Sequence, residues 1–283
     1  METLFYNLYT QSNNVEYDDD FKMFVESKNR EHKVLLESFQ NTNNITEVTA
    51  EDIIRDLKSV KRNKACGKDS VFYEHIIHGG FLVKKLVAKL FTAMLKFSYT
   101  PENMKEGIII TLHKGGKKSK KDPNNYRAIT LSSVFLKLFE KVIVDQLKTD
   151  NKLMINKLQG GFQEKMGCIM TSFAFRECLH FSKENHSKLY VCFLDSRQAF
   201  DRVWHDGLFY KLWQLGVNKV LYKSILSMYD GIKSKVRFRD HLSDWVHILQ
   251  GTKQGGVSSP LLYLVYINAL LEELESSKLG FCV

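Results

Sequence analysis

The chain of 283 residues has few cysteines and prolines, five and three respectively. The number of cysteines is odd and no two form a C-x-x-C pair, which excludes a disulfide scaffold and indicates a reducing, intracellular setting. The most apolar stretch, Pro260 to Leu271, is interrupted by Asn268 and is too short to span a bilayer. The N-terminal residues lack the basic flank and apolar centre of a secretion signal. We therefore expect an intracellular protein with no membrane association, in either the nucleus or the cytoplasm.

Candidate metal clusters are scarce as well. Cys66 is followed by His75 and His78, but a fourth ligand at zinc-finger spacing is missing. A core thiol with two surface imidazoles is therefore the favoured interpretation. The sequence also has no repeat with a period of roughly 20 to 50 residues, which excludes a solenoid.

Positive charge is in excess, with 41 Lys and Arg against 32 Asp and Glu and a net charge of +9. This modest excess favours a polyanionic partner such as nucleic acid but does not require one. The length is ample for a hydrophobic core and allows one large domain or two ordinary ones.

Local patterning predicts helices and two hairpins. Apolar residues at helical spacing, with capping residues such as Thr49 and Ser259, predict helices over 21–39, 49–62, 81–97, 134–147, 171–181, 208–215, 219–228 and 259–275. Strand patterns separated by polar turns predict one hairpin from 107–113 and 126–131 and another from 235–239 and 245–249. Residues 1–48 are polar and Asn-rich, and we expect them to form a peripheral lead-in to one domain over 49–283.

One apolar, β-branched run ends abruptly in an acid. The segment LYVCFLDSRQAFDRVWHD, residues 189–206, predicts a buried strand that ends at Asp195, with the aromatic Phe200 five residues on. Two interpretations fit these residues equally well. Asp195 either caps a turn or is delivered by the strand into an active site.

The tip of the first predicted hairpin is strongly basic. It carries Lys114, Lys117, Lys118, Lys120 and Lys121, and Arg127 follows beside Tyr126 on the returning strand. A guanidinium fork opposite a lysine ammonium can grip a triphosphate, whereas the alternative is a merely solvated loop. The same two interpretations apply to KRNKACGKDSV, residues 61–71, which presents positive charge on a turn.

A glycine pair precedes the last predicted helix in the segment GTKQGGVSSP, residues 251–260. Free backbone amides at a helix N-terminus favour negative charge, and the Gln254 amide can hydrogen-bond a base or a sugar. Glycine pairs at such places are also common as plain turns, so the segment alone does not define a site.

Four segments occur together in the order found in reverse transcriptases of non-LTR (LINE-like) retrotransposons. They are HKGGKKSKKDPNNYRAITL, LQGGFQ, FLDSRQAFDRVWHDGL and GTKQGGVSSPLLYLVYIN. From about residue 50 to its end the chain resembles that family, and NKACGKDSV and AFDRVWH resemble the non-LTR branch, in particular jockey-like elements. The resemblance implies an RNA-directed DNA polymerase of the α+β class. It implies the fingers and an incomplete palm of a right-hand polymerase, with helices packed on an antiparallel sheet and the thumb absent.

The resemblance also implies roles in the segment around 195. Asp195 matches the first catalytic aspartate, a ligand of both Mg²⁺ ions in two-metal nucleotidyl transfer. Phe200 matches the steric gate that would collide with a ribose 2′-hydroxyl and so select deoxynucleotides. Asp201 belongs to the same signature, and a structural, turn-capping role is favoured for it over direct metal binding.

Other matched residues lie on the hairpin and on the glycine loop. Lys114 and Arg127 match the residues that hold the incoming triphosphate, and Gln254 and Gly255 match the loop beside the nascent base pair. The partners implied are an RNA template, a DNA primer and deoxynucleoside triphosphates.

The sequence departs from the family in one motif. The other catalytic carboxylates lie in an aromatic-Ala-Asp-Asp hairpin, and no such motif occurs here. Mg²⁺ binds weakly to a lone carboxylate, so weak metal binding and negligible polymerase activity are expected of these 283 residues alone. The alternatives are a catalytically dead remnant that only binds nucleic acid and an unrelated phosphate-binding enzyme, for which the motif order would be coincidence.

Overall fold

The computed structural model describes residues 2–10, 18–39, 46–149, 153–163, 166–196 and 198–278. Within these ranges the chain forms eleven α-helices, a short 3₁₀ helix and one four-stranded sheet, so the predicted α+β class is confirmed. The helices are α1 (Glu2–Thr10), α2 (Asp19–Glu37), α3 (Ala50–Lys58), α4 (Tyr73–His78), α5 (Gly80–Phe97), α6 (Glu102–Lys105), α7 (Val134–Thr149), α8 (Cys168–Glu184), α9 (His205–Gln214), α10 (Lys219–Tyr229) and α11 (Ser259–Ser276).

The sheet has the order β2-β1-β3-β4, with strands β1 (Glu106–His113), β2 (Tyr126–Ser132), β3 (Lys233–Phe238) and β4 (His241–His247). Both predicted hairpins are present, because β1 pairs antiparallel with β2 and β3 pairs antiparallel with β4. The expectation of an antiparallel sheet is wrong at its centre, where β1 and β3 run parallel. A parallel pair needs a long crossover connection, and α7 to α10 lie between these two strands in the chain.

The helix ends follow from local chemistry. Thr49 and Asp52 form a capping box, in which Thr49 Oγ1 accepts from the Asp52 amide at 3.1 Å and Asp52 Oδ2 accepts from the Thr49 amide at 3.0 Å. The last helix starts one residue earlier than predicted, with Ser258 and not Ser259 at the N-cap position and Pro260 in the first turn. The predicted helices are thus confirmed, with ends shifted by a few residues.

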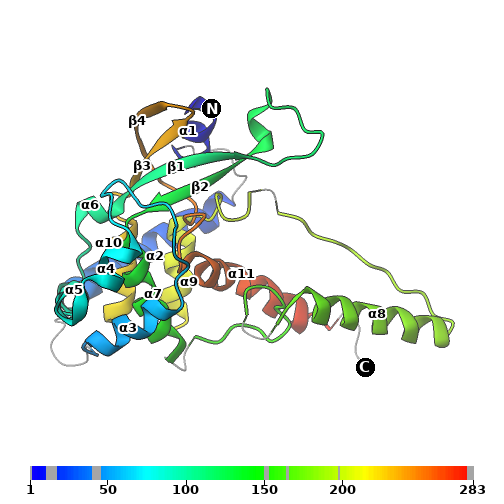
Figure 1. The fold of residues 1–283 in the computed structure, drawn as a ribbon. Helices are drawn as coiled ribbons and strands as arrows, with labels where there is room; N and C mark the ends of the chain where they lie inside the picture. Colours follow the sequence, from blue (N-terminus) through cyan, green and yellow to red (C-terminus); the bar gives the residue numbers. More distant parts are fainter. Residues whose placement is uncertain are drawn as a thin grey trace.

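Most of the helices lie beneath the sheet (Figure 1), and the main core lies among them. Buried apolar side chains of α3, α5, α7, α9, α10 and α11 form one cluster, in which the rings of Phe91 and Phe139 are 5.4 Å apart. A second cluster joins α1 to the inner face of the sheet through Tyr9, Ile109, Ala128, Ile232, Val236, Val246 and Ile248. The sheet therefore has one face packed on the protein and one outer face.

The lead-in is attached to this body at two described places. Besides α1, helix α2 packs on α9, where Asn29 Nδ2 donates to the Asp206 backbone oxygen at 2.9 Å. The His32 ring stacks on Trp213 with centroids 4.1 Å apart. The boundary at residue 48 stays a prediction. No helix in the described ranges combines the length and hydropathy that a bilayer crossing requires.

The predicted buried strand over 189–195 is wrong. These residues form no strand, and Tyr190, Phe193 and Leu194 are 88%, 82% and 78% exposed. An extended apolar run becomes a strand only when another strand pairs with it, and none of the four strands in the described ranges does so. In Figure 1 the run leads back from the far end of α8, which extends away from the other helices.

Candidate functional site

Two distant motifs pair along their backbones beneath the sheet. The Thr252 amide donates to the Phe200 oxygen at 2.7 Å, and the Gly251 amide donates to the Val203 oxygen at 2.7 Å. Trp204 and Gln250 continue the pairing as an isolated antiparallel bridge. The structure therefore brings the segment after Asp195 against the glycine loop, two motifs that sequence reasoning treated separately.

Glycine is required at position 251. Its φ is +89°, and a Cβ added there would lie 2.7 Å from the Asp201 backbone oxygen. His205 holds the other side of this contact, with Nε2 donating to the Gly251 oxygen at 2.8 Å. Burial lowers the pKa of His205 below its usual value, which favours the neutral ring with its proton on Nε2.

Asp201 is the buried centre of the site. The residue is only 5% exposed. Its two carboxylate oxygens accept from Tyr9 Oη at 3.0 Å and from Gln254 Nε2 at 2.7 Å. The expected structural role is supported, but the carboxylate acts by joining α1 to the glycine loop and not by capping a turn. Tyr9 carries no signal of this role in the sequence.

Burial raises the pKa of Asp201 to about 6, although the hydrogen bonds from Tyr9 and Gln254 and the charge of Lys114 oppose the shift. Between pH 3.8 and about pH 6, the folded chain therefore keeps a proton on Asp201 that the unfolded chain, with an ordinary carboxyl pKa of 3.8, has released. The stability from this group is complete below about pH 3.8 and is lost as the pH rises through about 6, an effect on the order of 3 kcal/mol.

The Asp201→Asn variant cannot ionise and should lack this pH dependence. Its free energy of unfolding, measured relative to the wild type by urea titration, is expected to rise by on the order of 3 kcal/mol between about pH 4 and about pH 7. A difference between the two proteins that stays constant over this range contradicts the prediction.

The glycine loop also lies along the edge of the sheet. The Thr130 amide of β2 donates to the Gln254 oxygen at 2.8 Å. Gly255 has φ +106°, and an added Cβ would lie 3.1 Å from the Thr130 oxygen. Gln254 and Gly255 are therefore held between β2 and Asp201.

Phe200 is half-buried in a group of aromatic rings. Its ring lies edge-to-face with Phe162 at 5.6 Å and 4.8 Å from the ring of Tyr263. Phe162 belongs to the LQGGFQ segment and Tyr263 to α11, so three of the four sequence motifs meet at this ring.

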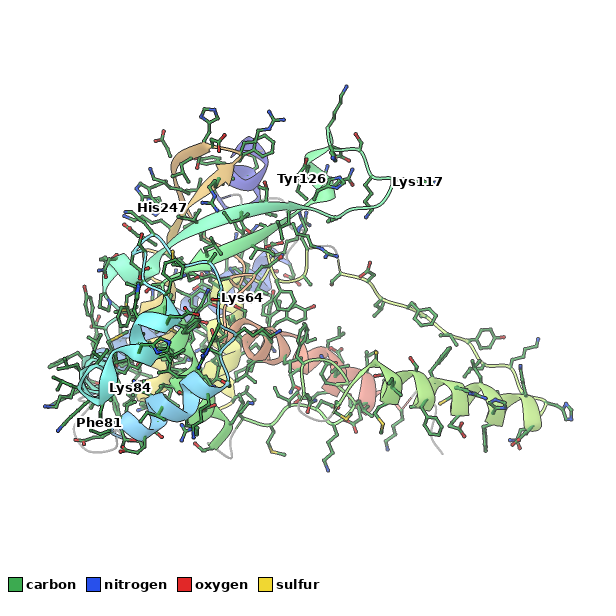
Figure 2. The ribbon with its side chains drawn as sticks, in the orientation of Figure 1. Lys64, Phe81, Lys84, Lys117, Tyr126 and His247 are labelled. Atoms are coloured by element: carbon green, nitrogen blue, oxygen red, sulfur yellow. The ribbon has the colours of Figure 1, made fainter. Side chains whose placement is uncertain are left out.

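The lysines of the hairpin tip lie on the connection between β1 and β2. Lys114 Nζ donates to the Asn124 oxygen at 2.8 Å, and Tyr126 Oη donates to the Lys120 oxygen at 3.0 Å. Figure 2 shows Lys117 on the connection that projects beyond the helices. Arg127 is exposed and, by strand alternation, faces away from the inner side of the sheet. The structure thus brings Lys114, but not Arg127, into electrostatic contact with Asp201.

Asp195 is exposed at the end of the extended run, and no hydrogen bond or ion pair joins it to another residue of the described ranges. Those ranges also contain no group of three or more His, Cys, Asp or Glu side chains that could hold a metal ion. A lone carboxylate is a poor ligand set for Mg²⁺, so the described residues do not fit a two-metal site.

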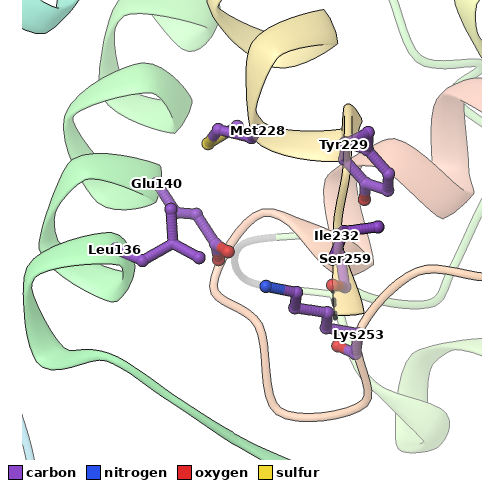
Figure 3. Close-up of a pocket in the computed structure, with 7 residues that line it drawn as sticks. All are labelled: Leu136, Glu140, Met228, Tyr229, Ile232, Lys253 and Ser259. Carbon is purple, nitrogen blue, oxygen red and sulfur yellow. Dashed lines mark hydrogen bonds between the residues drawn. The ribbon is translucent and has the colours of Figure 1, made fainter. Parts of the chain in front are cut away.

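A buried acid on α7 and a buried amine of the glycine loop itself lie next to each other, and the sequence analysis predicted neither. Figure 3 shows Glu140 of α7 and Lys253 pointing toward one another in a small cavity. Glu140 Oε2 accepts from the amides of Val257 at 2.5 Å and Ser258 at 3.1 Å. These two residues immediately precede α11, where backbone N–H groups need acceptors from outside the helix. An acid within the apolar pattern of α7 was a usable signal for Glu140.

Lys253 has no hydrogen-bond partner for its shielded Nζ among the described residues. Burial lowers the pKa of Lys253 to about 8, although the Glu140 carboxylate raises it. Ser259 Oγ donates to the Lys253 backbone oxygen at 2.8 Å and ties the loop to α11.

The site combines a basic hairpin, a glycine loop at a helix N-terminus and a buried Asp–Gln pair. Comparison of the sequence with protein families gives a match that includes the glycine loop and the Asp–Gln pair. The family model for reverse transcriptase (RNA-dependent DNA polymerase) matches residues 117–283, more than half of the chain. The chain therefore belongs to the reverse transcriptase family.

Its relatives include polymerases of mobile elements from Drosophila melanogaster. The chain is 31% identical to a probable RNA-directed DNA polymerase from transposon BS, over 78% of this chain and 24% of that protein. It is 32% identical to the RNA-directed DNA polymerase from mobile element jockey, over 85% of this chain and 26% of that protein. The predicted reverse transcriptase of a non-LTR, jockey-like element is thus confirmed. The chain spans about a quarter of the length of these relatives.

Proposed function

We propose that this chain provides the fingers and part of the palm of an RNA-directed DNA polymerase. It would bind an RNA template, a DNA primer and the incoming deoxynucleoside triphosphate. The observation that carries the proposal is the backbone pairing of 200–203 with 251–252, which holds Gln254 on Asp201 beside the basic hairpin. Membership of a polymerase family supports it and implies a divalent metal ion.

We propose that Gln254 presents an acceptor to the nucleotide. Because its Nε2 donates to Asp201, the carbonyl oxygen Oε1 is the atom left to accept from a sugar hydroxyl or a base. Phe200 would restrict the space beside the sugar, a role supported by the rings that hold it. Lys114 and Arg127 would contact the triphosphate, and Gly255 would let the backbone approach it closely.

Asp195 as the catalytic acid and metal ligand stays a prediction. Its exposure and its lack of carboxylate neighbours in the described ranges favour a second candidate function, nucleic-acid binding without catalysis by these 283 residues. A primer-extension assay with the purified chain separates the two candidates. Magnesium-dependent extension on an RNA template would favour catalysis.

The hairpin tip is expected to contribute strongly to template–primer binding. Replacing Lys117, Lys118, Lys120 and Lys121 by glutamine should weaken binding and lower the slope of log Kd against log salt by about 0.7–0.9 for each lysine that contacts a phosphate. Fluorescence anisotropy with a labelled RNA–DNA template–primer measures both quantities.

Four exposed helical lysines provide a matched control for the charge removed. They are Lys33, Lys58, Lys85 and Lys89. Their replacement by glutamine should leave the salt slope nearly unchanged. An equal loss of binding in both variants would show that net charge, and not the hairpin tip, is responsible.

A further inference from the structure

Three lysines surround one tryptophan on the outer face of the sheet. The Nζ atoms of Lys68, Lys233 and Lys235 lie 4.7, 4.9 and 5.1 Å from the ring centroid of Trp245. Lys68 comes from the loop before α4, whereas the other two come from β3. One half-exposed aromatic ring thus gathers ammonium groups from two separate parts of the chain.

Strand register defines this face. Lys235 pairs with Trp245 across β3 and β4, and Lys233 pairs with His247, which Figure 2 labels. Alternate residues of a strand point to the same side and lie about 7 Å apart, so Arg237 continues the row of cations along β3. Val246 points to the opposite side, into the cluster with Tyr9, so the helix α1 that packs on β4 leaves the outer face uncovered.

Negative charge does not balance the cations. Glu106 of β1 pairs with Lys68 at 2.6 Å and with Lys233 at 3.3 Å. Burial acts to raise the pKa of Glu106, but these two ammonium groups lower it below its ordinary value. Lys235 and Arg237 form no ion pair with any acid in the described ranges, so the face keeps a positive surplus around an aromatic ring. We call Lys68, Lys233, Lys235, Arg237 and Trp245 the outer patch.

We propose that the outer patch binds single-stranded nucleic acid, with one base stacked on Trp245 and the flanking phosphates paired with Lys235, Arg237 and Lys68. An aromatic platform among cations suits this ligand, because an unpaired base has an exposed π-face and the backbone carries the matching charge. A duplex keeps its bases stacked on each other and offers only its phosphates. The site lies on the opposite side of the sheet from Tyr9, so it goes beyond the function proposed above.

Binding of a labelled single-stranded oligonucleotide to the purified chain tests the proposal. Trp245→Leu should weaken binding of both RNA and DNA by about 5- to 100-fold, whereas Trp245→Phe keeps a stacking ring and should retain most of the affinity. Lys235→Glu keeps the ring but reverses a charge, and it should weaken binding and lower the salt slope. Phe97→Leu, which removes an aromatic side chain 71% exposed on α5, is the matched control and should have no effect.

Two measurements exclude a folding defect and mere charge attraction. Thermal melting should show that the variants fold, and oligonucleotide addition should quench the tryptophan fluorescence of the wild type more than that of Trp245→Phe. Equal binding of single strand and duplex with no effect of Trp245→Leu would overturn the proposal. So would competition by polyglutamate or by anionic lipid vesicles as effective as that by an unlabelled oligonucleotide.

The same variants separate this site from the proposed polymerase function. Trp245→Leu should leave binding of a fully paired template–primer nearly unchanged, whereas the glutamine variant of the hairpin tip should weaken it. A loss of template–primer binding in Trp245→Leu equal to its loss of single-strand binding would contradict a separate site. If the glutamine variant of the hairpin tip binds both the template–primer and the single strand as the wild type does, that result would count against the polymerase proposal alone.

Discussion

The Glu140→Ala variant is expected to lose about 3–5 kcal/mol in free energy of unfolding. Glu140 is 4% exposed and accepts from the amides of Val257 and Ser258. Its removal leaves two donors at the start of α11 without this acceptor, and that of Ser258, which is 3% exposed, is buried. It also takes away the negative charge that faces the shielded amine of Lys253.

Urea denaturation measures this loss, and two further variants interpret it. Glu177→Ala, at an exposed helical position on α8, should change the free energy of unfolding by less than about 0.5 kcal/mol. The double variant Glu140→Ala with Lys253→Met should lose less than the sum of the two single changes, because no unpaired amine is left buried. Equal stability of Glu140→Ala and Glu177→Ala would refute the anchoring role of Glu140.

The Gly251→Ala variant is expected to be destabilised by about 2–4 kcal/mol, with a fall in Tm of roughly 5–15 °C. Its backbone has φ +89°, and the added Cβ would lie 2.7 Å from the oxygen and 2.9 Å from the carbonyl carbon of Asp201. Both contacts are with backbone, which cannot rotate away. The pairing between 200–203 and 251–252 must therefore move apart.

Gly161→Ala provides the matched control for this substitution. An added Cβ at Gly161 meets no atom within 4 Å among the described residues, and its φ is not in the left-handed region. Differential scanning calorimetry should therefore find its Tm close to that of the wild type. Equal Tm values for Gly251→Ala and Gly161→Ala would show that position 251 accepts a Cβ without strain.

The sequence predicted those elements whose stability is local. The capping box of Thr49 and Asp52 and the alternation in the two hairpins depend on neighbouring residues, so periodicity was sufficient to find them. The parallel pairing of β1 with β3 depends on how the intervening helices pack and leaves no local pattern. The run ending at Asp195 failed for the same reason, since its composition favours a strand but cannot supply a partner.

The candidate site was predicted in part. The resemblance indicated Phe200, Gln254 and Gly255. The structure pairs the backbone of Phe200 with Thr252 and places the other two against Thr130 of β2. It did not predict Tyr9, because the hydrogen bond from that residue to Asp201 joins positions 192 residues apart in the chain. Hydrogen bonds of this kind are specified by the tertiary fold and not by any spacing in the chain.

The exposed position of α8 has a consequence for how the chain unfolds. Ser182 is the only buried residue of that helix, and the extended run that follows it is exposed as well. A segment that shares so little buried surface with the rest can open while the remaining core stays intact. The main unfolding transition should therefore involve a cooperative unit that is shorter than the chain. The slope of its free energy of unfolding against denaturant concentration should be that of a smaller protein.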